Sequence, residues 1–302
     1  METKPLNGDQ SIDPLLPPAM ASKAEEIGVA KAKMPFLKLL ALSVLAGAFI
    51  AMGALFATTV GAGDISVRDA LGEPAFSSGM PYGVTRLLAG IVFSVGLILV
   101  IVGGAELFTG NNLIIMAFSS RRVTLRALLR NWAVVYFGNL VGSVATAWLV
   151  FLSKQYTFGK GVVGLAALNI GELKTSFDFI QAIALGILCN ALVCLAVWLC
   201  FSARSTTDKV LSIIPTIACF VAAGFEHCIA NMYFIPLALL IKSSGNTAFF
   251  ESIGKTPDAF SHLNWENFFV ANLLPVTIGN IIGGAVMVGL VYWFVYRSDA
   301  NK

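Results

Sequence analysis

The chain has 302 residues, of which 57% are hydrophobic and only 12% are charged. Soluble globular domains carry about twice this charged fraction, so the composition excludes the ordinary soluble classes and predicts an integral membrane protein. The net charge of +3 is too small to indicate nucleic-acid binding, and no nucleic-acid partner is expected.

Residues 1–36 form a polar tail that lacks the continuous apolar core of a signal peptide. A short helix is predicted over residues 19–33, because Pro17 and Pro18 suit a helix start and Pro35 suits its end. Its apolar residues share one face at helical spacing. Two placements stay open: a solvated leader, or an amphipathic segment at the membrane surface or against the mouth of a pore.

Six apolar runs follow, and each is at least as long as the ~20 residues that a membrane-spanning helix needs. We therefore predict an all-α membrane protein, with a six-helix channel domain over residues 37–296 and a short C-terminal tail, residues 297–302. The predicted spans are Leu37–Val60, Leu87–Phe118, Trp132–Leu152, Phe179–Phe201, Val210–Ile241 and Phe268–Tyr296.

The second and fifth spans differ from the others in length and polarity. Each is about 30 residues long, more than one upright helix needs. Each also carries polar residues near its middle, in the stretches 106–112 and 226–231. Unwound backbone survives at membrane depth only where it is buried in protein or lines a cavity. The pattern predicts that helices 2 and 5 are interrupted and that both interruptions lie inside the protein.

A repeated spacing relates the third and sixth spans. Asn131 precedes the pair Gly138–Asn139 by seven residues, and Asn272 precedes the pair Gly279–Asn280 by the same distance. Three spans per half is an odd number, so the second half must be inverted in the membrane. The sequence therefore predicts an inverted 3+3 repeat, in which a substrate site lies near the midplane between the halves.

Lysine and arginine are distributed unequally between the two sides of the predicted spans. Thirteen of the 20 lie on the side that holds both tails, and seven lie on the other. Because an excess of positive charge marks the cytoplasmic side, both termini are predicted to be cytoplasmic, in a multi-pass protein of the inner (plasma) membrane.

The middle of the fifth span carries the strongest indication of function. Glu226 and His227 lie there between apolar stretches, and His227 is one of only two histidines in the chain. Ionisable groups at membrane depth are costly and mark pathways, and the ends of interrupted helices expose N–H groups that favour anions. We expect a weak-acid anion to gain a proton at His227, cross a dry constriction as the neutral acid, and lose the proton beyond it. Glu226 would hold the imidazole charged or cap a helix end.

No metal, cofactor or catalytic motif accompanies this pair. The five cysteines fall in apolar runs and form no C-x-x-C pair, so no zinc or redox site is predicted. Nucleotide-binding and hydrolase motifs are missing. A haem-carrying membrane subunit would need two facing histidines, which one membrane histidine cannot supply. We therefore expect neither a cofactor nor an enzyme.

Several ordered motifs resemble the formate–nitrite transporter family over residues 14–296. The stretch Gly224–Met232 resembles its fifth-helix signature, and Ala105–Gly110 resembles its second-helix signature. Further similar stretches are Asn131–Trp132, Tyr136–Asn139, Asn190–Trp198 and Pro275–Gly284. The resemblance implies an aquaporin-like six-helix protomer in a homopentamer, with one pore in each protomer for small monovalent anions.

The resemblance also implies roles for single residues. Lys174 would attract anions at the outer mouth, and residues 19–33 could close the cytoplasmic mouth at low pH. Phe93, Leu97 and Phe220 would form the constrictions, although their spacing alone is more typical of ordinary core residues. The implied pathway residues are His227, Glu226, Thr109, Asn190, Asn280 and Lys174.

Formate, together with protons, is the favoured substrate. The long N-terminal tail and the stretch Phe260–Leu263 look most like formate channels. The stretch Thr109–Asn112 also occurs in nitrite-type members, which leaves nitrite or hydrosulfide as the alternative. A channel for neutral solutes is more remote, because Asn-Pro-Ala boxes are missing and His227 favours an ionising substrate.

Overall fold

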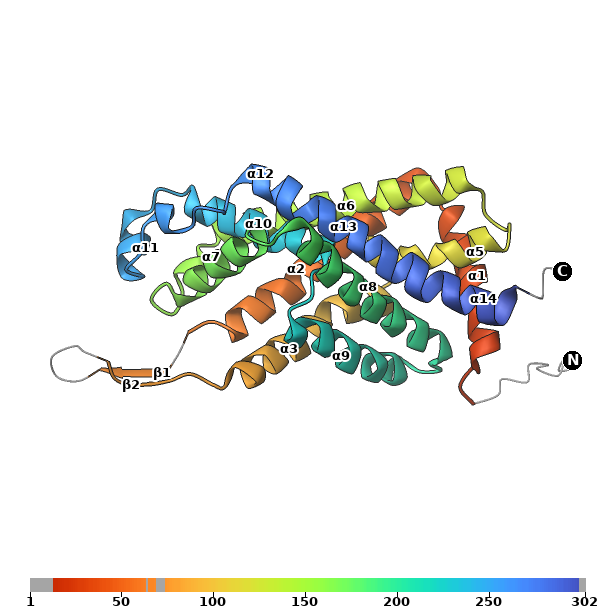
Figure 1. The fold of residues 1–302 in the computed structure, drawn as a ribbon, viewed down its shortest axis with the longest axis horizontal. Helices are drawn as coiled ribbons and strands as arrows, with labels where there is room; N and C mark the ends of the chain where they lie inside the picture. Colours follow the sequence, from red (N-terminus) through yellow and green to blue (C-terminus); the bar gives the residue numbers. More distant parts are fainter. Residues whose placement is uncertain (1–12, 64, 69–73, 299–302) are drawn as a thin grey trace, which may run out of the picture.

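The computed structural model describes residues 13–63, 65–68 and 74–298, so residues 1–12 of the predicted N-terminal tail and 299–302 of the predicted C-terminal tail lie outside the described residues. Within these ranges the chain is almost entirely helical (Figure 1), and the predicted all-α membrane fold is confirmed. Six of the described helices are long and apolar enough to cross a membrane: α2 (Phe36–Val60), α3 (Tyr82–Gly103), α6 (Leu125–Leu152), α8 (Phe179–Ser202), α9 (Thr206–Ala223) and the continuous helix Trp265–Arg297.

The sixth span is one helix whose winding changes along its length. It consists of α12 (Trp265–Asn267), η4 (Phe268–Leu273), α13 (Leu274–Ile281), η5 (Ile282–Leu290) and α14 (Val291–Arg297). The segments η4 and η5 are wound as π-helix. Such wider turns occur often beside functional positions in helices, and these two flank the segment that carries Asn280.

The second and fifth apolar runs are each divided near their middle. After α3, helix resumes as α4 (Phe108–Asn111), η1 (Asn112–Ile114) and α5 (Ile115–Ser119), and after α9 it resumes as α10 (Cys228–Lys242). A left-handed glycine ends each first half: Gly104 has φ 80° and Gly224 has φ 79°. Glycine adopts this conformation without steric cost because it has no Cβ, so it stops the helix at both places.

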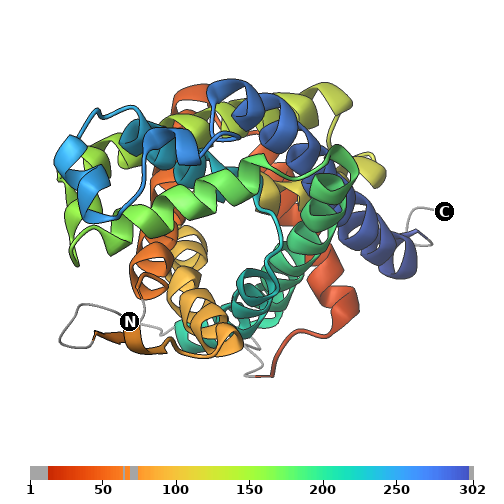
Figure 2. The ribbon, with the colours of Figure 1, turned by 60° about the vertical axis from the view of Figure 1, so that its left-hand side comes forward.

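The remaining elements gather at the two ends of the bundle (Figures 1 and 2). One end, here called the terminal side, holds α1 (Pro17–Ala32), the connection 120–124 and the end of α14. The opposite end, here called the far side, holds the antiparallel hairpin of β1 (Ile65–Arg68) and β2 (Pro74–Ser78), and the elements η2 (Gln155–Thr157), α7 (Val162–Thr175), α11 (Thr247–Ser252) and η3 (Pro257–Ala259). The sequence analysis did not predict α7 or the hairpin.

Glycines four residues after the glycine of each repeated Gly-Asn pair let the spans approach closely in both halves. A Cβ added to Gly142 of α6 would lie 1.9 Å from the carbonyl oxygen of Val44 on α2. A Cβ added to Gly283 of the sixth span would lie 2.1 Å from the carbonyl oxygen of Ile187 on α8. Both distances are far inside van der Waals contact, so a larger residue would push the helices apart. The first and third spans of each half are therefore packed in the same way.

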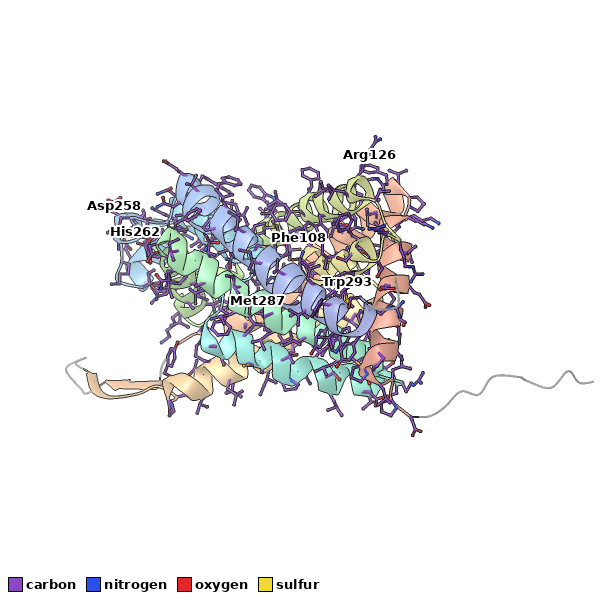
Figure 3. All side chains as sticks on the ribbon, turned by 45° about the vertical axis from the view of Figure 1, so that its right-hand side comes forward. Phe108, Arg126, Asp258, His262, Met287 and Trp293 are labelled. Carbon is purple, nitrogen blue, oxygen red and sulfur yellow. The ribbon has the colours of Figure 1, made fainter. Side chains whose placement is uncertain are left out.

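α1 packs across the terminal side of the bundle, where it contacts α5, η1, α8 and α14. Its buried Glu25 accepts hydrogen bonds from Ser120, from Arg122 at 3.3 Å and from Arg297 at 3.0 and 3.1 Å. Trp293 of α14, labelled in Figure 3, donates to the same Ser120 at 2.8 Å. Of the two placements that the sequence left open, the structure has α1 lying against the bundle.

Glu25→Gln is expected to loosen α1, because Arg122 and Arg297 lose the carboxylate that they share. Hydrogen bonds to charged groups contribute about 1.5–3 kcal/mol each, and a loss of about 2 kcal/mol corresponds to roughly a 30-fold larger detached population. Limited trypsin digestion in detergent should cleave α1 at least about tenfold faster than in the wild type. Glu26→Gln, exposed on the same helix, is the control. If trypsin cleaves Glu25→Gln at the wild-type rate, the ion pairs of Glu25 with Arg122 and Arg297 do not hold α1 against the bundle.

Candidate functional site

At each of the two breaks, one asparagine forms hydrogen bonds with the backbone on both sides of the break. Asn139 of α6 donates to the carbonyl group of Glu106 and accepts from the N–H group that opens α4, both at 2.9 Å. Asn280 of α13 donates to the carbonyl group of Glu226 at 2.9 Å and accepts from the N–H group that opens α10 at 3.0 Å. Each amide satisfies backbone groups that the interrupted helix leaves without partners. The asparagine of each repeated Gly-Asn pair therefore forms the same backbone hydrogen bonds at the break of its own half.

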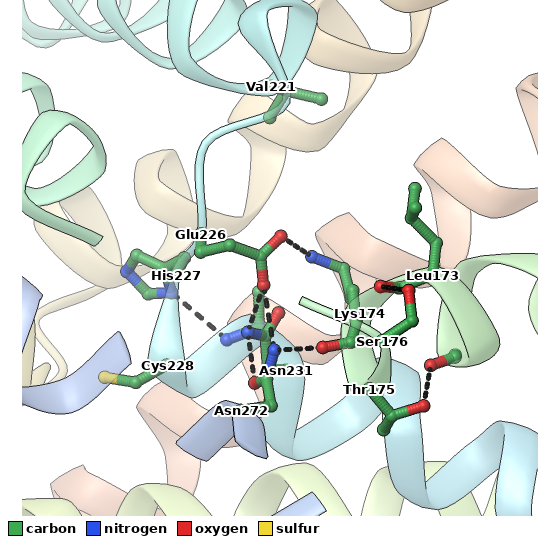
Figure 4. A network of polar contacts seen from close by, with 12 residues as sticks. Leu173, Lys174, Thr175, Ser176, Val221, Glu226, His227, Cys228, Asn231 and Asn272 are labelled. Atoms are coloured by element: carbon green, nitrogen blue, oxygen red, sulfur yellow. Dashed lines mark hydrogen bonds and ion pairs between the residues drawn. The ribbon is translucent and has the colours of Figure 1, made fainter. Parts of the chain in front are cut away.

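Glu226 is buried in a network with one cation and two amides (Figure 4). Its Oε1 accepts from Nζ of Lys174 at 2.6 Å, and its Oε2 accepts from Nδ2 of Asn231 at 2.7 Å and of Asn272 at 3.1 Å. Asn272 also donates to the carbonyl group of Lys174 at 2.7 Å. A buried carboxylate is tolerated when it is paired and hydrogen-bonded, and both oxygens of Glu226 have such partners.

A matching network lies at the other break. Glu106 accepts from Lys31 and from Asn111, both at 2.7 Å, and Asn111 donates to Asn131 at 2.9 Å. Asn131 in turn donates to the carbonyl group of Lys31 at 3.0 Å. Because Lys31 belongs to α1, the N-terminal helix supplies to the first half what α7 supplies to the second. The sequence analysis did not include Lys31, Asn111 or Asn131 among the candidate site residues.

His227 joins the two halves of the protein. Its Nδ1 accepts from the N–H group of Ala230 at 3.1 Å and so caps α10, while its Nε2 lies 3.0 Å from Oγ1 of Thr109 on α4. Because Nδ1 accepts a hydrogen bond, the neutral ring carries its proton on Nε2 and directs it at Thr109. The structure thus brings together two residues that the sequence placed in separate spans.

The structure gives Glu226 and Lys174 contacts that the sequence did not indicate. Glu226 is directed at Lys174 and the two amides, whereas the imidazole of His227 points away to the other side of the segment (Figure 4). His227 has an extended backbone, and neighbouring side chains project to opposite sides of such a segment. The side-chain hydrogen bonds of Glu226 thus go to Lys174, Asn231 and Asn272, and the side chain that caps α10 is that of His227. Lys174 forms an ion pair with Glu226, and its role in attracting anions at the outer mouth stays a prediction.

Two of the predicted constriction residues meet next to His227. The rings of Phe93 and Phe220 lie edge to face at 5.6 Å between centroids, and the Phe220 ring stacks on the imidazole at 6.0 Å. Both phenylalanines are 3% exposed. Leu97 lies one turn beyond Phe93 on α3, where it lines a cavity on the terminal side.

The cavity has a volume of about 310 Å³ and is covered by α1. Burial lowers the pKa of Lys23, and the neighbouring cations Lys209 and Arg204 lower it further. A cavity with more cations than carboxylates attracts anions from solution. The charged lining residues are Lys23, Lys31, Lys209 and Glu106.

Asn190 of α8 anchors the segment behind Thr109. Its Nδ2 donates to the carbonyl groups of Asn280 at 2.6 Å and of Thr109 at 3.3 Å, and to Oδ1 of Asn112 at 3.0 Å. These bonds tie the first-half break to the sixth span. Asn190 therefore supports the backbone of Thr109, whose hydroxyl group contacts His227.

The sequence of this chain was compared with protein families and with known proteins. The family described as the formate/nitrite transporter matches residues 18–294. The formate channel FocA of Escherichia coli (strain K12) is 45% identical over 294 residues, which cover 97% of this chain and 99% of the relative. The formate channel FocA of Haemophilus influenzae is 39% identical over 285 residues, 94% of this chain and 95% of the relative.

Two solved structures share the fold. A structure described as a pentameric formate channel with formate bound has a TM-score of 0.78 and 46% identity, and the match covers 86% of this chain and 97% of that one. A structure described as an FNT family ion channel has a TM-score of 0.71 and 26% identity, and the match covers 92% of this chain and 98% of that one.

Proposed function

The chain belongs to the formate/nitrite transporter family, and we propose that it passes formate, as a small monovalent weak-acid anion, through a pore in each protomer. Near full-length similarity to two relatives named as formate channels supports formate over nitrite or hydrosulfide. The observation that carries the proposal is the pairing of His227 with Thr109 beside the rings of Phe93 and Phe220. An imidazole beside these apolar rings can give a proton to a weak-acid anion at the point where the rings exclude a bare ion.

The proposed path runs from the far side past Phe93 and Phe220 to His227 and Thr109, and then past Leu97 into the terminal-side cavity. Apolar rings exclude hydrated ions by dewetting. A neutral acid avoids the large cost of taking a charge through low dielectric. Asn190 and Asn280 hold the breaks, and the Lys174–Glu226 pair fixes the segment that carries His227.

Protonation of the anion requires a complete account of the protons at His227. The Nε2 proton can pass to formate only if Nδ1 receives a proton, because an imidazole that loses its single proton is too basic to persist. Nδ1 then gives up the hydrogen bond from Ala230 that caps α10. Nδ1 takes up a proton that enters from solution with the anion, and the acid releases its proton to water beyond the constriction. The ring then returns to its Nε2–H form by proton exchange with water, so one formate and one proton cross together. Each crossing is therefore coupled to a transient opening of the first turn of α10.

Assembly and orientation belong to the same proposal. The chain forms a homopentamer, an assembly supported by its similarity to the protein described as a pentameric formate channel. The terminal side faces the cytoplasm in the inner (plasma) membrane, a placement supported by the thirteen lysines and arginines on that side of the spans against seven on the other.

The test is uptake of formate and of nitrite into proteoliposomes, measured side by side at a neutral and an acidic pH, with protein-free liposomes as the background. The proposal expects formate to enter faster than nitrite, with a rate that saturates and depends on pH. Faster nitrite uptake would make nitrite the substrate. Flux of neither anion through an intact assembly would favour a neutral-solute channel.

Phe220→Ala is expected to widen the passage, because it removes the ring that contacts both Phe93 and His227. Removing a buried aromatic ring leaves a cavity that larger anions can enter. The ratio of lactate to formate uptake should rise by roughly threefold or more. Phe269→Ala, which truncates a ring 49% exposed on η4, should leave the ratio unchanged. An unchanged ratio in Phe220→Ala would remove this ring from the path.

A further inference from the structure

Arg86 lies near the far-side start of α3 and holds the end of α9, where the fifth span breaks. Its Nη2 donates to the carbonyl group of Val221, and its Nε donates to that of Ala222 at 3.4 Å. In Figure 4, Val221 stands at the top of the segment that descends to Glu226 and His227. The last carbonyl groups of a helix carry partial negative charge, and that of Val221 also accepts from the N–H group of Gly224 at 3.1 Å. The guanidinium therefore offsets negative charge that would repel an anion at this entrance.

Arg86 shares a helix face with the proposed constriction. Phe93 and Leu97 follow it by seven and eleven positions on α3, and 3.6 residues per turn places all three side chains on one stripe. At 1.5 Å per residue, Arg86 stands about 10 Å outside Phe93 along the helix. The side chain is only partly buried, and two of its five donors are used by the carbonyl groups of α9. The other three donors have no hydrogen-bond partner among the described residues, so they remain available for a ligand.

The other broken span carries a cation in a comparable place. Lys209 lies eleven positions before Phe220 on α9, a spacing that places both side chains on the same face of the helix. Lys209 also lines the terminal-side cavity. Lys31 and Lys174, in contrast, are each paired with a buried glutamate. Each broken span therefore begins with a cation on the same stripe as its constriction ring, one at each end of the path.

We propose that Arg86 is the anion-binding residue at the far-side mouth, where it takes a small monovalent carboxylate before the anion passes Phe93. The inference rests on the proposed function. A planar guanidinium matches a carboxylate through parallel N–H donors and stays charged at every relevant pH. Because the site acts through charge and is open to solvent, its contribution must weaken as salt screens it.

The experiment measures initial formate uptake into proteoliposomes at subsaturating formate, in about 10 mM and about 500 mM of an impermeant salt, where the Debye length falls from roughly 30 Å to about 4 Å. Arg86→Gln is expected to lower the rate roughly three- to tenfold at low salt and less than about twofold at high salt. Arg86→Lys keeps the charge and should retain most of the low-salt rate. Lys255→Gln removes an exposed far-side cation and should behave as the wild type.

The outcomes separate this inference from the proposed function. If Arg86→Gln and Arg86→Lys lose the same fraction of flux at both salt concentrations, Arg86 only caps α9 and the inference is wrong. Wild-type rates in Arg86→Gln would also overturn it. Absence of formate flux in the wild-type protein would instead refute the proposed function. Size-exclusion chromatography of each variant in detergent establishes that it assembles. If Arg86→Gln does not assemble, the salt dependence of Arg86→Lys still tests the inference.

Discussion

In His227→Phe, the rate of pH-dependent formate uptake is expected to fall at least about a hundredfold. A positioned proton donor contributes roughly 10²–10⁴-fold to the rate of the step that it serves. The phenyl ring keeps the stacking on Phe220 but has neither the Nε2 proton directed at Thr109 nor the Nδ1 that caps α10. Formate that still crosses must do so as the bare anion and carry its charge. Uptake into proteoliposomes and current across a planar bilayer, recorded on the same preparation, measure both effects.

The second histidine gives a matched control for this variant. His262 is exposed in the far-side connection, where its Nδ1 lies 3.0 Å from Oε1 of Glu172, remote in sequence from the breaks. His262→Phe should keep both the rate and its pH dependence. Should His227→Phe carry formate with the wild-type pH dependence and no current, protonation at this ring would not be part of the transport step.

The elements that the sequence predicts well are those whose signal is local. Polar residues near the middle of an apolar run predict a break, and the breaks lie between Gly103 and Phe108 and between Ala223 and Cys228. The spacing from Asn131 to Asn139 recurs from Asn272 to Asn280, and the structure explains both asparagine pairs by equivalent contacts. A glutamate followed by an asparagine five residues later also recurs in the two broken spans, and this spacing would have identified Asn111 and Asn231 as members of the networks.

The features that the sequence does not predict depend on contacts between distant segments. Lys31 lies 75 residues before Glu106 in a polar tail, so nothing near it indicates that it pairs with a buried carboxylate. The direction of the Glu226 side chain depends on α7, a helix that the sequence analysis did not include. Neighbouring positions in the chain suggested that Glu226 acts on His227, but the extended backbone between them turns the two side chains apart.

Glu226→Gln is expected to destabilise the protein by about 3–5 kcal/mol, because it leaves the Lys174 cation without its counter-charge at a site where breaking a buried pair is costly. The Lys174 side chain is only 14% exposed, so water compensates little for the lost carboxylate. The free energy of unfolding, measured by equilibrium SDS titration in mixed micelles, should fall by this amount. Glu266→Gln, which changes an exposed carboxylate on the far side, should have no measurable effect.

The double variant Lys174→Met with Glu226→Gln decides why the single change is costly. Glutamine still offers an oxygen to Asn231 and Asn272, and methionine fills the volume of the lysine stem over the Phe234 ring, on which Lys174 now lies at 5.4 Å. Replacing both partners of a buried pair is often neutral, whereas removing one is not. The double variant should therefore recover at least half of the lost free energy of unfolding. If it is as unstable as Glu226→Gln alone, the carboxylate stabilises the break through the two amides, and the charge of Lys174 contributes little.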